Sequence, residues 1–322
     1  LESVPGITDK ILMETADLPQ GSIKPQFDRY LKALEALKLK YGNKSESIGH
    51  GISGEVQWSD AARTWITMLN IAKDYAVPIV SDQIKFSDVF FPNGTNEIVE
   101  GIYKYNPLSE FFNQIMAKAI QHLVLQLVKK VGGTRKVRIL EFGAGTGSTT
   151  AYVLRGLKEF GKDIEYVYSD VSAHFLSIAR DKFSNEYAFV NYQLFNLNGD
   201  IEQQNMEPAS FDIILGTNAI HISQNISTAL INLKRAMTPS GYLLINELTF
   251  NHDALTLTFG LFTGWWEYED ENMRIKDSPL ISLPNWGTLL KAYGFRNVEA
   301  FDFPDTFMNG ISLQHVILCQ SN

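Results

Sequence analysis

The sequence predicts an α/β fold, in which a mostly parallel sheet covered by helices follows a mostly helical segment. From about Lys136, short apolar strands alternate with amphipathic helices, and no such alternation precedes residue 130. A glycine-rich stretch separates the first strand from the first helix. Alternating strands and helices form a parallel sheet, because each helix returns the chain to the end where the previous strand began.

Seven strands are expected, five of them in the alternating region. These five are residues 137–142, 164–169, 192–195, 211–215 and 242–246, with helices at 148–160, 174–183 and 226–237. A further helix at 284–293 precedes strands at 298–303 and 313–319. Asn309-Gly310 is a turn signal between these two strands, so they are expected to be antiparallel.

The segment before residue 130 has apolar residues at helical spacing. Residues 27, 30, 31, 34 and 37 lie on one face of a predicted helix, and residues 65, 68, 69 and 72 repeat the pattern. We therefore expect a mostly helical N-terminal subdomain at 1–130, which acts as a lid or linker. The sheet-containing core is expected at 131–322, with an aromatic insertion at about 251–283.

Composition excludes several classes of function. The chain has 28 basic and 36 acidic residues, a net charge of -8, and no long basic run, so neither nucleic acid nor an anionic membrane is expected as a partner. No apolar stretch reaches the roughly 20 residues that span a bilayer. The N-terminus lacks the features of a signal peptide and reads as an excised piece of a longer chain.

Cysteine and histidine usage argues against a metal centre. Cys319 is the single cysteine, which excludes an intramolecular disulfide and fits a cytoplasmic location. No two of the six histidines are three or four residues apart, so metal-ligand spacing is absent and no metal is expected.

The glycine-rich stretch is the strongest motif in the chain. It reads Glu141-Phe142-Gly143-Ala144-Gly145-Thr146-Gly147 and joins a strand to a helix, where glycines let a ligand approach the backbone and the helix start offers free N–H groups. An ordinary tight turn and a dinucleotide site are the alternatives. The preceding carboxylate and the Gly-x-Gly-x-Gly spacing favour S-adenosylmethionine, whose sulfonium and ammonium groups suit an acidic neighbour.

Residues after the second and third strands are further candidates for cofactor binding. Asp170 ends the second strand, where a carboxylate binds ribose hydroxyls in sheets of this kind, although it also fits a helix N-cap. Asn196 and Leu197 follow the third strand and are expected beside adenine, with a surface loop as the alternative.

A histidine and a glutamate follow the fourth and fifth strands. His221 lies just past the fourth strand and Glu247 ends the fifth, so both are expected at the carboxyl edge of the sheet. We interpret them as a general base and the carboxylate that fixes its tautomer, although a lone histidine there is often structural. The loss from Glu247→Gln should be smaller than the loss from His221→Ala if an amide still positions the imidazole.

These motifs resemble the class I S-adenosylmethionine-dependent methyltransferases, which have a Rossmann-like seven-stranded sheet. The resemblance rests on the glycine loop and on residues 211–221 and 245–248. More narrowly, residues 260–266, followed by Arg274, Leu280, Trp286 and Gly294-Phe295, resemble the C-methyltransferase domains of polyketide synthases. The match covers Tyr105 to Cys319, and the residues before it are closer to bacterial modular synthases than to fungal iterative ones.

The resemblance implies C-methylation of a β-ketoacyl thioester at its alpha carbon. The substrate would be carried by the phosphopantetheine arm of an acyl carrier protein among neighbouring synthase domains, and S-adenosylhomocysteine would be the product. Asn218 is predicted to contact the cofactor together with the glycine loop. Because typical carriers are acidic like this chain, a locally basic or apolar docking patch is expected.

The aromatic insertion has two interpretations. Phe262, Trp265 and Trp266, with Tyr105 from the helical segment, are expected to line a lid over the substrate, or else to form an ordinary hydrophobic subcore. The alternatives to the overall interpretation are an O- or N-methyltransferase acting on a carrier-bound chain, a catalytically silent domain of a megasynthase, and a nicotinamide-dependent reductase.

Overall fold

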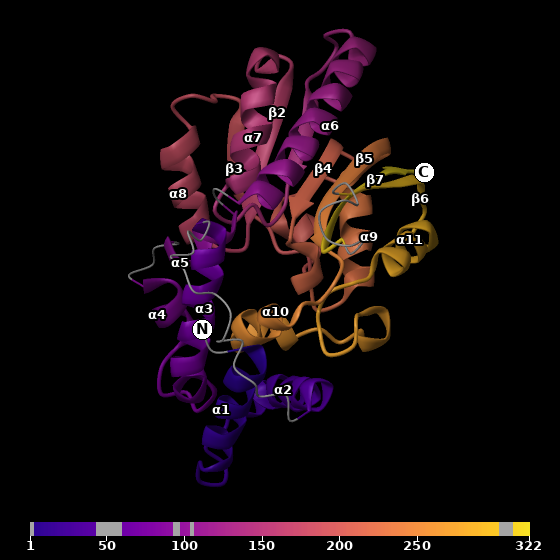
Figure 1. The fold of residues 1–322 in the computed structure, drawn as a ribbon. Coiled ribbons are helices and arrows are strands. Elements are labelled where there is room, and N and C mark those ends of the chain that lie inside the picture. Colours follow the sequence, from indigo (N-terminus) through magenta and orange to yellow (C-terminus); the bar gives the residue numbers. More distant parts are fainter. Residues whose placement is uncertain (1–2, 43–59, 93–96, 104–105, 303–311) are drawn as a thin grey trace. The chain divides into compact units, whose positions relative to one another are not determined.

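The computed structural model describes residues 3–42, 60–92, 97–103, 106–302 and 312–322, and it contains two compact units (Figure 1). The helical unit comprises residues 1–109, 251–267 and 275–279. The sheet unit comprises residues 110–250, 268–274 and 280–322. The chain therefore passes between the units several times, and each unit is described by itself below.

This division differs from the boundary expected at residue 130. Helix α6 (Pro107–Val131) lies in the sheet unit from Glu110 onward, because its apolar face is buried there through Met116, Ile120 and Val124. Its neighbour is α7 (Ser148–Leu157), where a Cβ on Gly156 would lie 3.9 Å from the Cβ of Gln121. Much of the expected insertion at 251–283 instead belongs to the helical unit.

The helical unit forms a core of its own. Its helices are α1 (Val4–Ala16), α2 (Asp28–Tyr41), α3 (Asp60–Val80), α4 (Phe86–Phe90), α5 (Glu97–Tyr103) and α10 (Asp253–Thr258), with 3-10 turns η1 (Pro25–Phe27), η6 (Phe259–Leu261) and η7 (Thr263–Trp266). The expected apolar face of α2 is buried through Tyr30, Leu34 and Leu37. The Tyr30 hydroxyl donates to the carbonyl of Leu257 at 3.3 Å, which ties α2 to α10.

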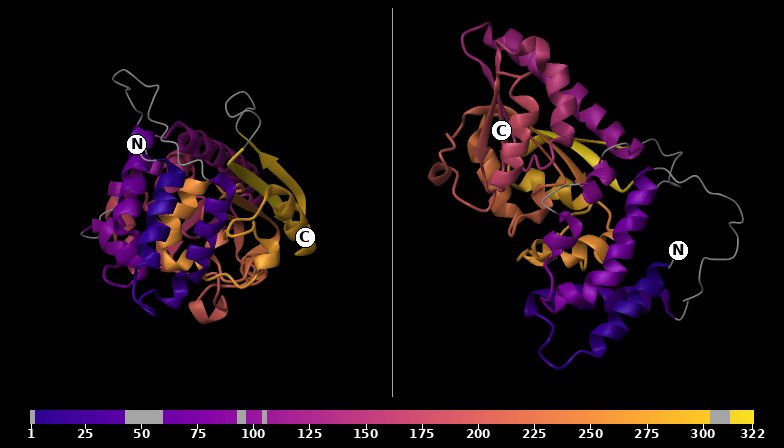
Figure 2. Two further views of the ribbon diagram at one scale, coloured as in Figure 1. Left: turned by 60° about the horizontal axis from the view of Figure 1, so that its bottom comes forward. Right: turned by 90° about the vertical axis from the view of Figure 1, so that its left-hand side faces the viewer.

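The sheet unit contains the predicted seven-stranded sheet. The strands are β1 (Val137–Glu141), β2 (Ile164–Asp170), β3 (Val190–Leu194), β4 (Phe211–Thr217), β5 (Met237–Leu248), β6 (Phe295–Phe301) and β7 (Gln314–Ser321), in the order β3-β2-β1-β4-β5-β7-β6. All neighbouring strands are parallel except those paired with β7, which runs antiparallel to β5 and β6. Figure 2 shows β6 and β7, in yellow, at one edge of the sheet. The expected turn at Asn309-Gly310 lies outside the described residues.

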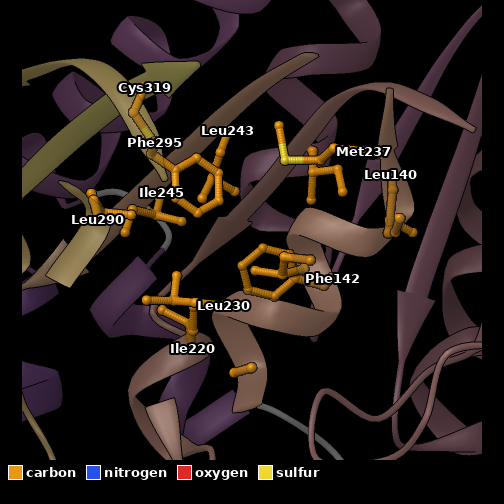
Figure 3. Packing of buried hydrophobic residues seen from close by; sticks show 14 of the residues in the cluster. Leu140, Phe142, Ile220, Leu230, Met237, Leu243, Ile245, Leu290, Phe295 and Cys319 are labelled. Carbon is orange, nitrogen blue, oxygen red and sulfur yellow. The ribbon is translucent and has the colours of Figure 1, made fainter. Parts of the chain in front are cut away.

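Helices cover the sheet on both faces. Helices α9 (Ile226–Ala236) and α11 (Leu283–Ala292) pack on one face of the sheet. Their residues Leu230 and Leu290 belong to one apolar cluster with the strand residues Leu140, Leu243 and Ile245 (Figure 3). Helix α7 covers the other face, since Thr150 in its first turn bonds the side chain of Glu141. Helix α8 (Ala173–Phe183) lies against β2 and β3.

The strand register brings the candidate residues to one edge of the sheet. Glu141, the last residue of β1, is paired with Leu215 near the end of β4, and Thr217 at the end of β4 is paired with Asn246. The glycine loop, Asp170, the turn carrying His221, and Glu247 therefore all lie at the carboxyl edge of the parallel strands. In the described part of the chain, no helix combines the length and apolarity needed to cross a bilayer.

Candidate active site

Positive φ angles define the glycine loop after β1. Gly143, Gly145 and Gly147 have φ of 57°, 56° and 72°, a region that disfavours residues with a side chain. A Cβ on Gly143 would lie 2.4 Å from the Cβ of Ala219, and one on Gly147 would lie 2.8 Å from the Phe183 ring. At Gly145 the nearest atom would be 3.9 Å away, so a ligand can approach the backbone there. Ala144 fastens the loop by donating its N–H to the carbonyl of Ser169 at 3.0 Å.

Asp170 ties the end of β2 to this loop. Its Oδ2 accepts the Gly145 N–H and its Oδ1 accepts the Ser172 N–H, both at 2.9 Å. Burial raises the pKa of the carboxyl, and the backbone N–H groups of Ser172, Gly145 and Val171 oppose that shift. The N-cap of α8 is Ser172, so Asp170 precedes the cap and does not occupy it.

Glu141 lies beneath the loop and is 1% exposed. Its Oε2 accepts hydrogen bonds from the Tyr166 hydroxyl at 2.6 Å and the Thr150 hydroxyl at 2.7 Å. Burial raises its pKa to about 7, against the effect of these two donors, and the charge of Asp170 raises it further. The carboxyl therefore links β1, β2 and α7, a role that the sequence did not indicate.

The three remaining cofactor candidates have local partners. Asn196 is exposed, and its Oδ1 accepts the Asn198 N–H at 2.9 Å. Leu197 is partly buried against the cluster on the α9 face. Asn218 has φ of 48° and its Oδ1 accepts the Leu248 N–H at 3.0 Å, so this side chain joins the ends of β4 and β5.

His221 and Glu247 form the buried pair that their positions after neighbouring strands predict. His221 lies in the turn η5 (Ile220–Ile222) and is 3% exposed, and Glu247 is fully buried. The two atoms His221 Nδ1 and Glu247 Oε2 are 2.6 Å apart. Glu247 Oε1 accepts the N–H groups of Ala219 at 2.9 Å and Ile220 at 3.1 Å. The carboxylate is thus fixed by the same turn that carries the histidine.

Two groups at this edge were not predicted from the sequence. In the sequence, Arg274 contributes only to the family resemblance, yet in the structure its guanidinium donates to the carbonyl of His221 at 2.6 Å. The Thr149 hydroxyl lies 2.8 Å from Asn113 Oδ1 and 3.0 Å from the Thr217 hydroxyl, which joins α6, α7 and β4 beside the glycine loop. A single polar residue within the apolar pattern of a helix does not indicate in the sequence which distant residue it contacts.

Three of the four aromatic candidates, Phe262, Trp265 and Trp266, lie in the helical unit. Trp265 and Trp266 are buried there, with the Trp265 ring stacked 5.9 Å from that of Phe259 and Trp266 Nε1 donating to the carbonyl of Gly260 at 2.7 Å. Both side chains therefore pack inside that unit, as the subcore interpretation expects, and their role in a lid stays a prediction. Phe262 is 40% exposed and its ring lies 5.6 Å from that of Phe86. Tyr105 lies outside the described residues.

No cluster of three or more histidine, cysteine, aspartate and glutamate side chains with metal-binding geometry occurs among the residues that the structure describes. Besides His221, the sheet unit places His315 at a buried position. There Nδ1 lies 2.7 Å from the Thr249 hydroxyl, and burial lowers the imidazole pKa. The hydroxyl of Thr249, one residue past β5, thus fixes the His315 side chain on β7.

Comparison with known proteins agrees with the geometry. A family model described as a methyltransferase domain matches residues 140–243, from β1 into β5. Polyketide synthase PksM of Bacillus subtilis is 33% identical over 277 residues, which are 83% of this chain and 6% of the relative. The non-reducing polyketide synthase esdpA of Penicillium shearii is 36% identical over 214 residues, 66% of this chain and 9% of the relative. The chain therefore spans less than a tenth of either relative.

A solved structure extends the similarity to nearly the whole chain. The DszA carbon methyltransferase is 28% identical and has a TM-score of 0.86, with 98% of this chain and 88% of that chain covered. The similarity thus includes the helical unit as well as the sheet unit.

Proposed function

The chain belongs to the methyltransferase domains found in polyketide synthases, and we propose that it transfers the methyl group of S-adenosylmethionine to a carbon atom of an acyl chain. The single observation that carries the proposal is the buried contact between His221 Nδ1 and Glu247 Oε2 at 2.6 Å. Removal of a proton from carbon requires a base, and a histidine bonded to a carboxylate has the arrangement of a general base.

The pair sets the protonation of the imidazole. Glu247 is an acceptor when ionised, so His221 Nδ1 carries the proton and the lone pair of the neutral ring lies on Nε2. His221 Nε2 is therefore the atom that removes the proton. Glu247 then stabilises the imidazolium and is itself held by the N–H groups of Ala219 and Ile220. General bases of this kind contribute about 100- to 10,000-fold to the rate.

The glycine loop and Asp170 fit the cofactor. A backbone that stays open at Gly145, the start of α7, and a carboxylate at the end of β2 converge at this edge, and together they suit a nucleoside with a charged amino-acid tail. When bound, S-adenosylmethionine supplies an electrophilic methyl group. Asp170 would hold the ribose, while Asn196, Leu197 and Asn218 are the proposed contacts around the rest of the nucleoside.

The proposed substrate is a β-ketoacyl thioester on an acyl carrier protein. The proton on the carbon between a ketone and a thioester is acidic enough for an imidazole, whereas an already acidic hydroxyl would have less need of the pair. The relatives are polyketide synthases, and the DszA structure is named as a carbon methyltransferase. Both facts favour carbon over oxygen or nitrogen as the methyl acceptor, and a tethered over a free substrate.

The test separates proton removal from methyl transfer. Deuterium uptake at the alpha carbon of a carrier-bound β-ketoacyl thioester is followed by mass spectrometry without S-adenosylmethionine, after subtraction of the uncatalysed exchange. The wild type should accelerate uptake, and His221→Ala should abolish that acceleration while cofactor affinity, measured by calorimetry, stays within about threefold.

The matched control is His122→Ala, an exposed histidine on α6 bonded to Gln126, which should behave as the wild type. Equal uptake by wild type and His221→Ala would show that enolate formation is not the role of His221. Methylation of oxygen or nitrogen would then become the better interpretation.

A further inference from the structure

Arg274 holds the backbone of the turn that carries His221. Its Nη1 donates to the carbonyl of His221 at 2.6 Å and its Nη2 to the carbonyl of Ser223 at 2.8 Å. The side chain of Arg274 is fully buried. Two carbonyls of one short turn are therefore bonded by a single planar group, which fixes the direction of the backbone at His221.

An ion pair fixes the guanidinium in turn. Arg274 Nε donates to Asp270 Oδ1 at 2.6 Å, and Asp270 Oδ2 accepts the N–H of Ile226, the first residue of α9, at 2.7 Å. The Tyr268 ring lies 5.2 Å from the guanidinium carbon. Asp270 and Arg274 thus connect the start of α9 with the turn η5 immediately before it.

Burying a charge at this place needs a reason beyond packing. A buried ion pair loses its hydration, and an apolar pair of similar volume often stabilises a fold equally well. An apolar pair would leave the carbonyls of His221 and Ser223 without these donors, and it could not set the direction of the turn. The geometry therefore favours a role in orientation over a role in stability.

We infer that Arg274 is a positioning residue, which acts through the backbone of η5 to hold the His221 imidazole against Glu247. This inference rests on the proposed role of His221 as the base. Glu247 holds the imidazole from the side of β5, and Arg274 holds the carbonyl of the same residue from the segment Tyr268–Arg274. The two supports act on different atoms of one residue, so loss of either displaces Nε2.

The variant for the test is Arg274→Lys, which keeps the charge next to Asp270 but loses the planar fork that reaches both carbonyls. Arg135→Lys is the matched control. Arg135 binds both oxygens of the buried Asp212 at 2.6 and 2.7 Å, near the opposite end of β4, so this change also breaks a bidentate pair in the sheet unit. Deuterium uptake, kcat, KM and the melting temperature are measured for both variants.

Arg274→Lys should reduce deuterium uptake and kcat together by at least about tenfold, with KM and the cofactor Kd within about threefold of wild type. Arg135→Lys should change the melting temperature but not kcat. Unchanged deuterium uptake in a folded Arg274→Lys protein would overturn the inference. If the two variants lose the same melting temperature, an equal decrease in kcat in both would also overturn it. If His221→Ala retains uptake, the proposed function itself fails. If only Arg274→Lys retains it, the positioning role alone fails.

Discussion

Replacing Glu247 by glutamine tests whether the carboxylate sets the tautomer of His221. In the structure, Oε1 accepts two backbone N–H groups while Oε2 faces His221 Nδ1. An amide must place its oxygen toward the two N–H groups, since its NH2 group would meet two donors there. The NH2 group then faces Nδ1, which becomes an acceptor, and the ring proton moves to Nε2, the atom that has to act as base.

The structure therefore changes the expectation for this variant. The sequence alone predicts a smaller loss for Glu247→Gln than for His221→Ala, because an amide can still hold the ring. The observed acceptor pattern instead predicts a ring held in the wrong tautomer, with a loss of kcat of about 100- to 10,000-fold, the full contribution of a general base. This loss corresponds to about 3 to 5 kcal/mol in the activation free energy.

Single-turnover methyl transfer and calorimetry with S-adenosylmethionine measure the effect. Cofactor affinity and melting temperature should change little, because the amide oxygen keeps the bonds to Ala219 and Ile220. Glu165→Gln is the control, since Glu165 forms a surface ion pair with Arg138 at 3.3 Å and should have no effect on turnover. A Glu247→Gln protein that retains kcat within about threefold would refute the tautomer assignment.

Two further predictions concern the carboxylates around the glycine loop. Asp170→Ala should weaken binding of S-adenosylmethionine by at least about tenfold in calorimetry, because hydrogen bonds to a charged group contribute about 1.5 to 3 kcal/mol; unchanged affinity would remove Asp170 from the site. Burial raises the Glu141 pKa to about 7 from 4.5, so the folded state keeps a proton that the unfolded chain releases. This raised pKa contributes about 3 kcal/mol to the free energy of unfolding below pH 4.5, and the contribution is lost as the pH rises through 7. Urea unfolding at pH 5 and pH 8 should show this decrease in the free energy of unfolding for the wild type but not for Glu141→Gln. The same pH dependence in both proteins would contradict the prediction.

The parallel sheet was predictable because each part of it has a local signal. Strand residues such as Leu140 and Ile245 lie in short apolar runs, and the helices between them repeat at three and four residues. The carboxyl edge followed from the same alternation, so the candidates that end strands, among them Asp170 and Glu247, were found from position alone. His221 was found in the same way, one turn after β4.

Other features depend on contacts between residues distant in the sequence, which leave no local pattern. Arg274 meets the carbonyl of His221 from 53 residues away in the sequence. Glu141 was interpreted through its neighbours in the glycine loop, whereas Tyr166 on β2 is one of its partners. The division into units was equally hidden, because residues 251–267 return to the helical unit after the sheet has begun.

The position of the transferred methyl group on the product shows whether carbon is the methyl acceptor. Methyl-13C S-adenosylmethionine is incubated with the protein and a β-ketoacyl thioester on an acyl carrier protein, and the product is examined by mass spectrometry and carbon NMR. A single labelled methyl bonded to the alpha carbon, absent from the His221→Ala reaction, is the predicted result. A label on oxygen or nitrogen would rule out carbon methylation, and transfer that persists in His221→Ala would rule out His221 as the base.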